Sequence, residues 1–362
     1  MQEGSINSNI SKPDSFFVQL SLAIVFIGVI FIISASWHES MHYFNNPWNF
    51  IIKHGVFIVL GLSLAYLFSV IHIQWLKKYA WFLSILVLLG LILTAKFGII
   101  TGGSRRWLDL GPVNLQVSEF AKIVVALITA KIFSEKKNYL LGFLFIGAIL
   151  FLVLKQPDLG TSILIAVSCA SAIFAAGFNL FVFLLSTIVM AGGAFAHIIN
   201  TPYQMARIKY WLQPELDPQG NGYNLIQSIK AIASGGIVGQ GIGESVQKLG
   251  PLPISYADFI FSIICEEIGF LGAIVVLIIF VAWIYRALYI CFCSHDKFTQ
   301  VFGFSLTMVF AMQVIINIAV TTGLFPITGM TLPFISFGGS SFIANSILAG
   351  IILNISRTNQ EY

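Results

Sequence analysis

Charge is scarce in this sequence. Only 9% of its 362 residues are Asp, Glu, Lys or Arg, whereas 57% are hydrophobic, and a soluble domain carries roughly 25% charged residues. So little charge cannot cover a water-soluble surface, which excludes the soluble globular classes. The net charge of +4 is small and scattered, so we expect no nucleic-acid partner. The apolar residues lie in long runs, and about 20 such residues span a bilayer.

Cysteine is also scarce. The four cysteines are Cys169, Cys265, Cys291 and Cys293, and none of them lies in a long polar loop. We therefore expect no structural disulfide. Cys291 and Cys293 have the wrong spacing for a CxxC redox pair, so the sequence offers no thiol-redox motif.

The apolar runs predict an all-α polytopic membrane protein with about ten transmembrane helices. The expected spans are residues 16–35, 54–72, 79–97, 117–134, 138–154, 159–177, 179–199, 259–290, 300–324 and 336–356. A long external loop, 200–258, joins the seventh and eighth spans. Residues 16–356 then form one transmembrane domain between a disordered tail, 1–15, and a short tail, 357–362.

Lysine and arginine near the helix ends indicate the orientation, because short cytoplasmic loops are enriched in these residues. One side of the membrane would hold Lys12, Lys77, Lys78, Lys131, Lys136, Lys137, Arg286, Lys297 and Arg357. The short loops of the other side hold fewer: Lys53, Lys96, Arg105, Arg106, Lys122 and Lys155. We therefore expect both tails in the cytoplasm and the segments 98–119, 155–161, 200–258 and 325–340 at the external face.

One stretch formally matches a zinc-protease pattern. His38-Glu39-Ser40-Met41-His42 fits HExxH, in which two histidines on one helix face bind zinc. The pattern requires a helix, but we expect this stretch in the loop after the first span, shortly before Pro47. No third-ligand motif is evident. We therefore interpret the residues as two interfacial histidines in a loop.

The long loop contains a glycine-rich stretch. Gly239-Gln-Gly241-Ile-Gly243 is neither GxGxxG nor a P-loop, so we expect a flexible or tight-turning loop without a phosphate site. Just before it, apolar residues recur at helical spacing: Tyr223, Ile226, Ile229, Ile232 and Ala233. That spacing predicts a short amphipathic helix on the membrane interface.

Polar residues near the spans are the strongest functional signal, because each is costly there. Glu119 and Lys122 are three residues apart on the fourth span and can pair on one helix face. Gln116 and Ser118 lie just before this pair in the sequence. Asp158 begins the sixth span, where a helix N-cap is the alternative to a functional role. A purely structural ion pair is the corresponding alternative for Glu119 and Lys122.

Asp258 is the main catalytic candidate. It stands where the long loop meets the eighth span, and a half-apolar site raises the pKa of a carboxyl, which suits a general base. The alternative is again an N-cap. Glu266 and Glu267 follow deeper in the span, and two adjacent acids there cannot both face lipid. We expect Glu266 to face the protein interior.

Taken together, these segments resemble the SEDS family, the bacterial polytopic membrane proteins that include RodA, FtsW and SpoVE. The resemblance rests on eight stretches in family order: Gly103-Ser-Arg-Arg-Trp107, Gln116-Val-Ser-Glu119 with Lys122, Gln156-Pro-Asp-Leu-Gly-Thr161, Tyr203-Gln-x-x-Arg207, Asp217-Pro-x-Gly-x-Gly-Tyr223, Ser234-Gly-Gly-x-x-Gly-x-Gly-x-Gly243, Asp258-Phe-Ile-Phe261 with Glu266-Glu-x-Gly-Phe270, and Leu332-Pro-Phe-Ile-Ser-Phe-Gly-Gly-Ser-Ser341. Val117 replaces the usual Pro, and Tyr256-Ala257 replace His-Thr, which puts in doubt any role for those neighbours.

The resemblance implies a peptidoglycan glycosyltransferase in the bacterial cytoplasmic (inner) membrane that polymerises lipid II. Asp258 matches the essential acid, and Glu119, Lys122 and Asp158, with Gln116 and Ser118, match residues that support the cavity. The expected substrate- and pyrophosphate-binding residues are Arg105, Arg106, Trp107, Arg207, Ser340 and Ser341. A divalent cation (Mg or Mn) could also offset pyrophosphate charge, although the sequence shows no dedicated ligand cluster for a metal.

Subfamily and partner also follow from the resemblance. Gln247-Lys-Leu249 and Met330-Thr-Leu-Pro333 are FtsW-like, whereas the short length is RodA-like, and we favour FtsW. Such proteins act with a class B penicillin-binding protein, a transpeptidase with one transmembrane helix, among other division or elongation proteins. The candidate helix-binding surface consists of small residues, although they could instead pack the bundle: Gly303, Ala311, Ala319, Ala344, Ser346, Ala349 and Gly350. A flippase for lipid-linked precursors and a non-catalytic division scaffold are the alternative functions.

Overall fold

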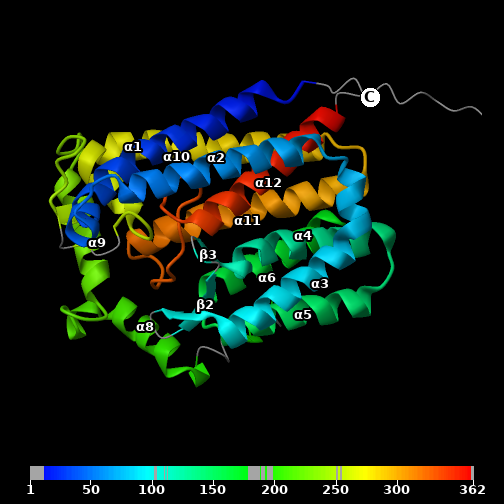
Figure 1. Cartoon of the computed structure of the whole chain (residues 1–362), viewed down its shortest axis with the longest axis horizontal. Helices are drawn as coiled ribbons and strands as arrows, with labels where there is room; N and C mark the ends of the chain where they lie inside the picture. The colour runs from blue at the N-terminus through cyan, green and yellow to red at the C-terminus, as the bar shows by residue number, and fades with distance from the viewer. Residues whose placement is uncertain are drawn as a thin grey trace, which may run out of the picture.

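The computed structural model describes residues 12–359 except 102–103, 110, 112, 178–187, 189–191, 194–198, 250–251 and 253–254. Within this part of the chain, each expected span except 179–199, most of which lies outside the described residues, coincides with a helix (Figure 1). These helices are α1 (Ser15–Phe44), α2 (Asn49–Val70), α3 (Ile73–Phe97), α4 (Val117–Glu135), α5 (Tyr139–Lys155), α6 (Leu159–Ala175), α10 (Ile260–Phe292), α11 (Lys297–Thr321) and α12 (Gly339–Thr358). The loop after 200 contributes α8 (Pro202–Leu212), α9 (Tyr223–Gly235) and two short 3-10 turns, η1 (Pro214–Leu216) and η2 (Gln247–Leu249).

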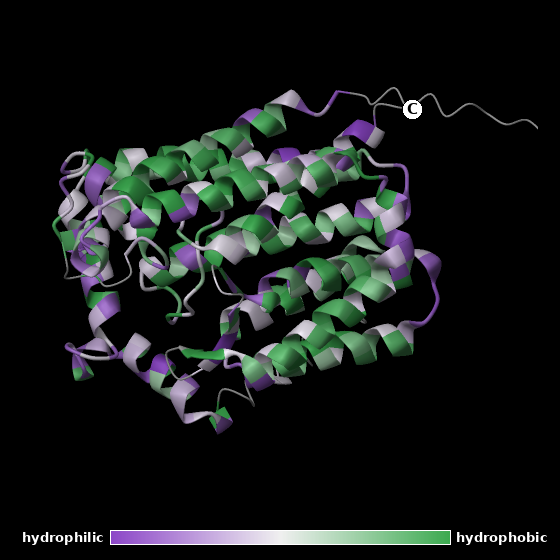
Figure 2. Cartoon of the chain, viewed as in Figure 1, coloured by the Kyte–Doolittle hydropathy of each residue, from purple (hydrophilic) through white to green (hydrophobic). Residues whose placement is uncertain are grey.

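The helices form a layered bundle whose centre includes α4, α11 and α12. In α12, 89% of the apolar stretch is buried, and in α11 72%, against 11% in α2 and 22% in α3. Hydrophobic residues cover the helices, and hydrophilic ones gather mainly toward the two ends of the bundle (Figure 2). Among the described residues, α1, α2, α3, α10, α11 and α12 are long and apolar enough to cross a membrane. The exposed apolar side chains of the outer helices therefore suit a lipid environment.

The start of α1 and the end of α12 lie at the same end of the bundle (Figure 1). Asp14 caps α1, and its carboxylate forms an ion pair with Arg286 of α10 at 2.5 Å. The Asp14 backbone N–H also donates to the Ser356 hydroxyl of α12 at 3.1 Å. α8 and α9 lie at the opposite end, as the expected topology requires. Which end faces the cytoplasm stays a prediction.

The first helix is longer than expected. It continues to Phe44, where Asn45 takes a left-handed conformation (φ 49°) and donates its N–H to the Met41 carbonyl, which terminates a helix. The prediction that His38–His42 lies in a loop is therefore wrong. The helix continues because no glycine or proline lies between Gly28 and Pro47.

A small antiparallel sheet, which the sequence analysis did not predict, precedes α4. Its strands are β1 (Ile99–Thr101), β2 (Ser104–Asp109) and β3 (Asn114–Leu115), in the order β1-β2-β3. Trp107 pairs with Ile99 across the first two strands. The sheet places Arg105 and Arg106, neighbours in β2, on opposite faces, because side chains alternate along a strand.

The predicted amphipathic helix is present as α9, and it also packs on the protein through a second face that the apolar spacing did not predict. Leu225, Ser228 and Ala231 are buried, whereas Ile229 is 45% exposed. The helix packs against α10 through small residues: a Cβ at Gly235 would lie 2.0 Å from the Cys265 carbonyl oxygen. Apolar spacing alone did not identify this face, because a serine and an alanine allow the closest approach of two backbones.

The small residues proposed as a partner-binding surface are mostly inside the bundle. Ala344, Ser346 and Ala349 are at most 5% exposed, and a Cβ at Gly350 would collide with the Ala65 backbone of α2. The prediction that they face lipid is therefore wrong for these residues. They serve the alternative, which is close packing of α12 against its neighbours.

Candidate functional site

Asp258 lies in the turn that precedes α10. The N-cap position of α10 belongs to Phe259, and no hydrogen bond to the Asp258 carboxylate is found within the described part of the chain. The acid therefore does not act as the helix cap that was its structural alternative. Gly329, with a positive φ of 73°, approaches the acid so closely that a Cβ there would lie 3.5 Å from Asp258 Oδ2.

The surroundings of Asp258 favour its neutral form. Burial raises the pKa of Asp258 from 3.8 to about 6, and the nearby Arg207 and Arg106 partly oppose this increase. A carboxyl with a pKa of about 6 is ionised at neutral pH and is a stronger base than an ordinary aspartate. The raised pKa expected for Asp258 is therefore present, and its role as a general base stays a prediction.

The two arginines near Asp258 are held by neutral carbonyl groups. Arg106 Nε donates to the Gln156 carbonyl at 3.0 Å, and its Nη2 donates to the Pro157 carbonyl. Arg207 Nη1 donates to the Ile327 carbonyl at 2.8 Å, and its Nη2 donates to the Tyr203 hydroxyl at 2.6 Å. Carbonyl acceptors orient a guanidinium without neutralising it. Both cations can therefore interact with an anionic group beside Asp258.

A second polar cluster lies at the start of α4. Glu119 and Lys122 form the predicted ion pair, with 2.8 Å between Oε2 and Nζ and no exposure of the Lys122 side chain. Lys122 Nζ also donates to Gln313 Oε1 of α11 at 2.6 Å. A lysine without solvent needs both partners, because an unpaired buried charge is strongly unfavourable.

Asp158 both caps α6 and joins the polar cluster. Its Oδ1 accepts from the Thr161 backbone N–H at 3.1 Å, and its Oδ2 accepts from the Thr161 hydroxyl at 2.9 Å. Oδ2 also accepts from Gln116 Nε2 at 3.2 Å and from the Ser118 hydroxyl at 3.3 Å. Gln116, Ser118 and Asp158 therefore lie together, and Asp158 also acts as the helix cap that was its structural alternative. Their support of a substrate cavity stays a prediction.

Two amides of α11, which the sequence analysis did not identify, connect the two regions. Gln313, the partner of Lys122, donates through Nε2 to the Thr331 carbonyl at 3.0 Å. One turn later, Asn317 Nδ2 donates to the backbone carbonyls of Asp258 at 3.0 Å and Met330 at 2.6 Å. Two amides four residues apart in an apolar span were the available signal, since such residues face one side of a helix.

Ser340 and Ser341, at the start of α12, are bonded to protein groups. The Ser340 hydroxyl accepts from the Gln116 backbone N–H at 2.9 Å. The Ser341 hydroxyl accepts from Thr331 Oγ1 at 2.8 Å and from Gln313 Nε2 at 3.3 Å. The two serines therefore join α12 to α4, α11 and the loop before it, and their predicted contact with substrate stays a prediction.

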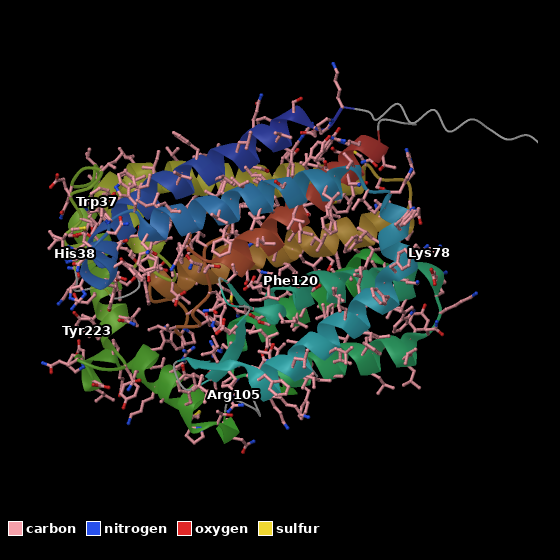
Figure 3. All side chains as sticks on the ribbon, in the orientation of Figure 1. Trp37, His38, Lys78, Arg105, Phe120 and Tyr223 are labelled. Carbon is pink, nitrogen blue, oxygen red and sulfur yellow. The ribbon has the colours of Figure 1, made fainter. Side chains whose placement is uncertain are left out.

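Within the described residues, no hydrogen bond joins the Arg105 or Trp107 side chain to Asp258 or to the polar cluster at the start of α4. Arg105 is exposed, donates to the Lys96 carbonyl at 2.8 Å, and lies at the lower edge of the view in Figure 3. Trp107 lies in β2, partly buried. Of the predicted basic-aromatic loop, only Arg106 is therefore near enough to Asp258 to change its pKa.

Glu266 and Glu267 both avoid lipid and are 1% exposed. The Glu266 carboxylate accepts from the Ser245 hydroxyl and from the Val246 backbone N–H. Glu267 pairs with Lys248 at 2.7 Å. The expected inward orientation of Glu266 is confirmed. The two acids fix the glycine-rich loop to α10, beside a break in that helix at Gly269 (φ 66°).

The HExxH residues do not form a ligand set in the described part of the chain. His38 and His42 are exposed, and Figure 3 labels His38 at the α9 end of the bundle, opposite Lys78. Glu39 accepts a hydrogen bond from Tyr256. Burial is the largest cause of the raised pKa of Tyr256, and the neighbouring Glu39 is the next. Among the described residues, no three His, Cys, Asp or Glu side chains are grouped as a metal site requires.

Comparison with known proteins places this geometry in context. The model of a cell cycle protein family named for FtsW, RodA and SpoVE matches residues 14–361. A probable peptidoglycan glycosyltransferase FtsW of Coxiella burnetii is 36% identical and aligns with 95% of this chain and 96% of its own length. Stage V sporulation protein E of Bacillus subtilis is 33% identical, over 96% of this chain and 98% of its own.

Solved structures have the same fold. A chain from a structure that describes the structural coordination of polymerization and crosslinking by a peptidoglycan synthase complex is 27% identical and superposes with a TM-score of 0.80, over 97% of this chain and 99% of its own. The rod shape determining protein RodA of Thermus thermophilus is 25% identical with a TM-score of 0.72, over 96% of this chain and 97% of its own. The similarity therefore covers nearly the whole of each chain.

Proposed function

The chain belongs to the FtsW, RodA and SpoVE family of cell cycle proteins and is a peptidoglycan glycosyltransferase, and we propose that it polymerises lipid II with Asp258 as the general base. The single observation that carries this role is the pairing of a partly accessible carboxyl, whose pKa is raised to about 6, with two nearby arginines. A base and cations at one place are what a glycosyl transfer to a hydroxyl requires, with a pyrophosphate as the leaving group.

The proposed step uses residues of this chain alone. Asp258 accepts the proton of the acceptor sugar's 4-hydroxyl as that oxygen attacks the anomeric carbon of the donor. The bond between this carbon and the lipid pyrophosphate breaks, and the pyrophosphate leaves with the bonding electron pair. Arg106 and Arg207 then offset the negative charge that develops on it.

A series of contacts from α4 and α11 positions the base. It involves Glu119, Lys122, Gln313 and Asn317. The ion pair fixes Gln313, which holds the backbone at Thr331, and Asn317 holds both Met330 and Asp258. This series of contacts fixes the distance between the catalytic turn and the loop that carries Gly329. An error of about 1 Å in such a distance can cost roughly a hundredfold in rate.

The test is polymerisation of lipid II by the purified chain, followed on a gel that resolves glycan strands. Asp258→Asn keeps the shape of the side chain and removes the base, so we expect folded protein without polymer. Asp109→Asn is the matched control, since Asp109 is an exposed acid in β2. A polymerisation rate for Asp258→Asn equal to that of Asp109→Asn would remove Asp258 from the mechanism.

We also propose a transpeptidase partner of the class B penicillin-binding type. A related structure describes polymerization and crosslinking by one synthase complex, and the described residues of this chain form a bundle without a separate soluble domain that could crosslink. The buried small residues of α12 are not its docking surface. Co-purification of the chain with a tagged transpeptidase of the same cell tests the partnership, and recovery no better than with an unrelated single-helix protein would contradict it.

A further inference from the structure

A cavity of about 320 Å³ opens among α8, the turn before α9 and the loop after α11. Its main lining residues are Tyr203, Arg207, Tyr210, Trp211, Asn221 and Asn224. Pockets that hold small molecules have volumes of roughly 300–1,000 Å³, so this cavity accommodates a small ligand group. Asp258 does not line it.

Hydrogen bonds to the protein fix the walls of this cavity. Trp211 Nε1 donates to the Gly323 carbonyl at 2.8 Å, so the indole ring is held in one orientation. Arg207 bridges the Ile327 carbonyl and the Tyr203 hydroxyl. The Asn221 backbone N–H and side-chain amide donate to Asp217 Oδ2 at 2.9 and 3.0 Å. A preformed pocket binds with little ordering cost.

The chemistry of the lining favours a sugar. Three aromatic rings offer apolar faces with polar tips, which suit the apolar C–H face and the hydroxyl rim of a pyranose. Two primary amides provide both donors and acceptors, and the Asn224 side chain makes no hydrogen bond to the protein within the described residues. Among the described residues, Arg207 is the one cation that lines the cavity, and aromatic and amide side chains make up most of the rest of the lining. A neutral, hydroxyl-rich ligand therefore fits better than a phosphate.

The position of the cavity connects it to the proposed reaction. Arg207 lines the cavity and also lies close enough to influence Asp258. Ile327, at the cavity wall, is two residues from Gly329, which borders the acid. A sugar in the cavity would therefore lie beside the reacting sugar and not at the reacting atoms.

We propose that this cavity is a saccharide subsite, which holds a sugar of the glycan substrate next to the one that reacts at Asp258. The inference rests on the proposed function for the identity of the glycan. It assigns Tyr210, Trp211 and Asn224 to substrate binding and gives them no part in the chemistry.

The test uses chitotetraose, an oligomer of N-acetylglucosamine, as a soluble probe with the full chain in detergent. Saturation-transfer NMR of the probe measures binding without turnover. We expect wild type and Asp258→Asn to bind equally, and Trp211→Ala and Asn224→Ala each to weaken binding roughly tenfold, as the loss of about 1.4 kcal/mol would. Trp75→Ala is the matched control, because Trp75 is 60% exposed on α3.

The two proposals can fail separately. If wild type polymerises lipid II but does not bind chitotetraose, or if Asn224→Ala and Trp211→Ala bind it as Trp75→Ala does, the subsite is overturned and the enzyme assignment stands. A signal that depends on Trp211 with a free stem peptide, and not with chitotetraose, also overturns it. If the probe binds but Asp258→Asn polymerises normally, the general base is wrong and the subsite stands. Because Trp211→Ala could disturb α8, Asn224→Ala decides the outcome if that variant does not fold.

Discussion

Asp258 and Glu119 both lie near the start of a helix, yet their surroundings differ. Glu119 pairs with Lys122 at 2.8 Å, and that lysine is bound by Gln313. Asp258 has no ion-pair partner within the described part of the chain, and its arginine neighbours are held by carbonyl groups. A paired carboxylate is held in position by its partner, whereas an unpaired one is available to accept a proton. The same residue class therefore supports the bundle at one place and chemistry at the other.

Removing the partner of Glu119 should have the largest effect on stability. Lys122→Met leaves Glu119 unpaired in the bundle, and we expect a loss on the order of 3–5 kcal/mol in unfolding free energy. The measurement is thermal unfolding in detergent. The double variant Glu119→Gln with Lys122→Met should recover part of this loss. Equal stability of Lys122→Met and wild type would show that the pair contributes little.

Asp258→Asn should show the opposite behaviour in the same unfolding assay. The pKa of Asp258 is raised from 3.8 to about 6 in the folded chain. The folded state therefore binds more protons than the unfolded state between these values, and stability decreases as pH rises through them. The neutral amide avoids this cost, so at pH 7 the variant should be at least as stable as wild type while it is inactive. A strongly destabilised Asp258→Asn would indicate a structural role.

The two neighbouring arginines of β2 should differ in their effect on the polymerisation rate. Arg106→Gln should lower polymerisation by roughly 10²–10³, as loss of one electrostatic donor does in other active sites. Arg105→Gln is its matched control and should change the rate little, because Arg105 is exposed and bonded to Lys96. Initial rates with lipid II measure both. Equal losses would mean that both arginines contact the substrate.

The rate should also depend on pH through Asp258 alone. Below the pKa of about 6 the base is protonated, so the rate should decrease about tenfold for each further unit of pH. Above it the rate should level off. The profile of polymerisation between pH 5 and pH 8 is the measurement, with unfolding followed in parallel. A flat profile would contradict the assignment of the base.

Replacing Gln313 should reduce stability less than replacing Lys122, because the substitution removes a hydrogen bond and no charge. Gln313→Leu leaves Lys122 with Glu119 but frees the Thr331 carbonyl, which should cost about 1–3 kcal/mol. We expect a lower rate without loss of expression. Gln300→Leu, on the same helix near the opposite end, is the control. A normal rate for Gln313→Leu would show that the loop at Thr331 needs no such support.

Topology can be tested without changing stability. Gln219 is exposed in the loop between α8 and α9, so Gln219→Cys should react with an impermeant thiol reagent added to intact cells, after removal of the exposed Cys293. Reaction only after lysis would invert the predicted orientation. An external glycan product would then be excluded.

Much of the fold and of the site was predictable from the sequence, because both depend on local costs. Apolar runs of spanning length require helices in lipid, since backbone groups there must bond internally. The Glu119–Lys122 pair follows from a spacing of three residues on one helix. Asp258 became a candidate because a carboxyl at the membrane boundary is costly unless it has a function, and the family resemblance implied its catalytic role, which stays a prediction.

Only tertiary packing decided the rest. Lys122 meets Gln313, 191 positions later, and Gln116 meets Ser340, 224 positions later. Residue type did not reveal which of Arg105 and Arg106 approaches Asp258. The choice depends on β2, a strand that was not predicted, in which successive side chains point to opposite faces. The small residues of α12 were assigned to lipid and lie inside the bundle. Spacing along the chain records which side chains share a face, but which neighbour covers that face depends on how all the helices pack together.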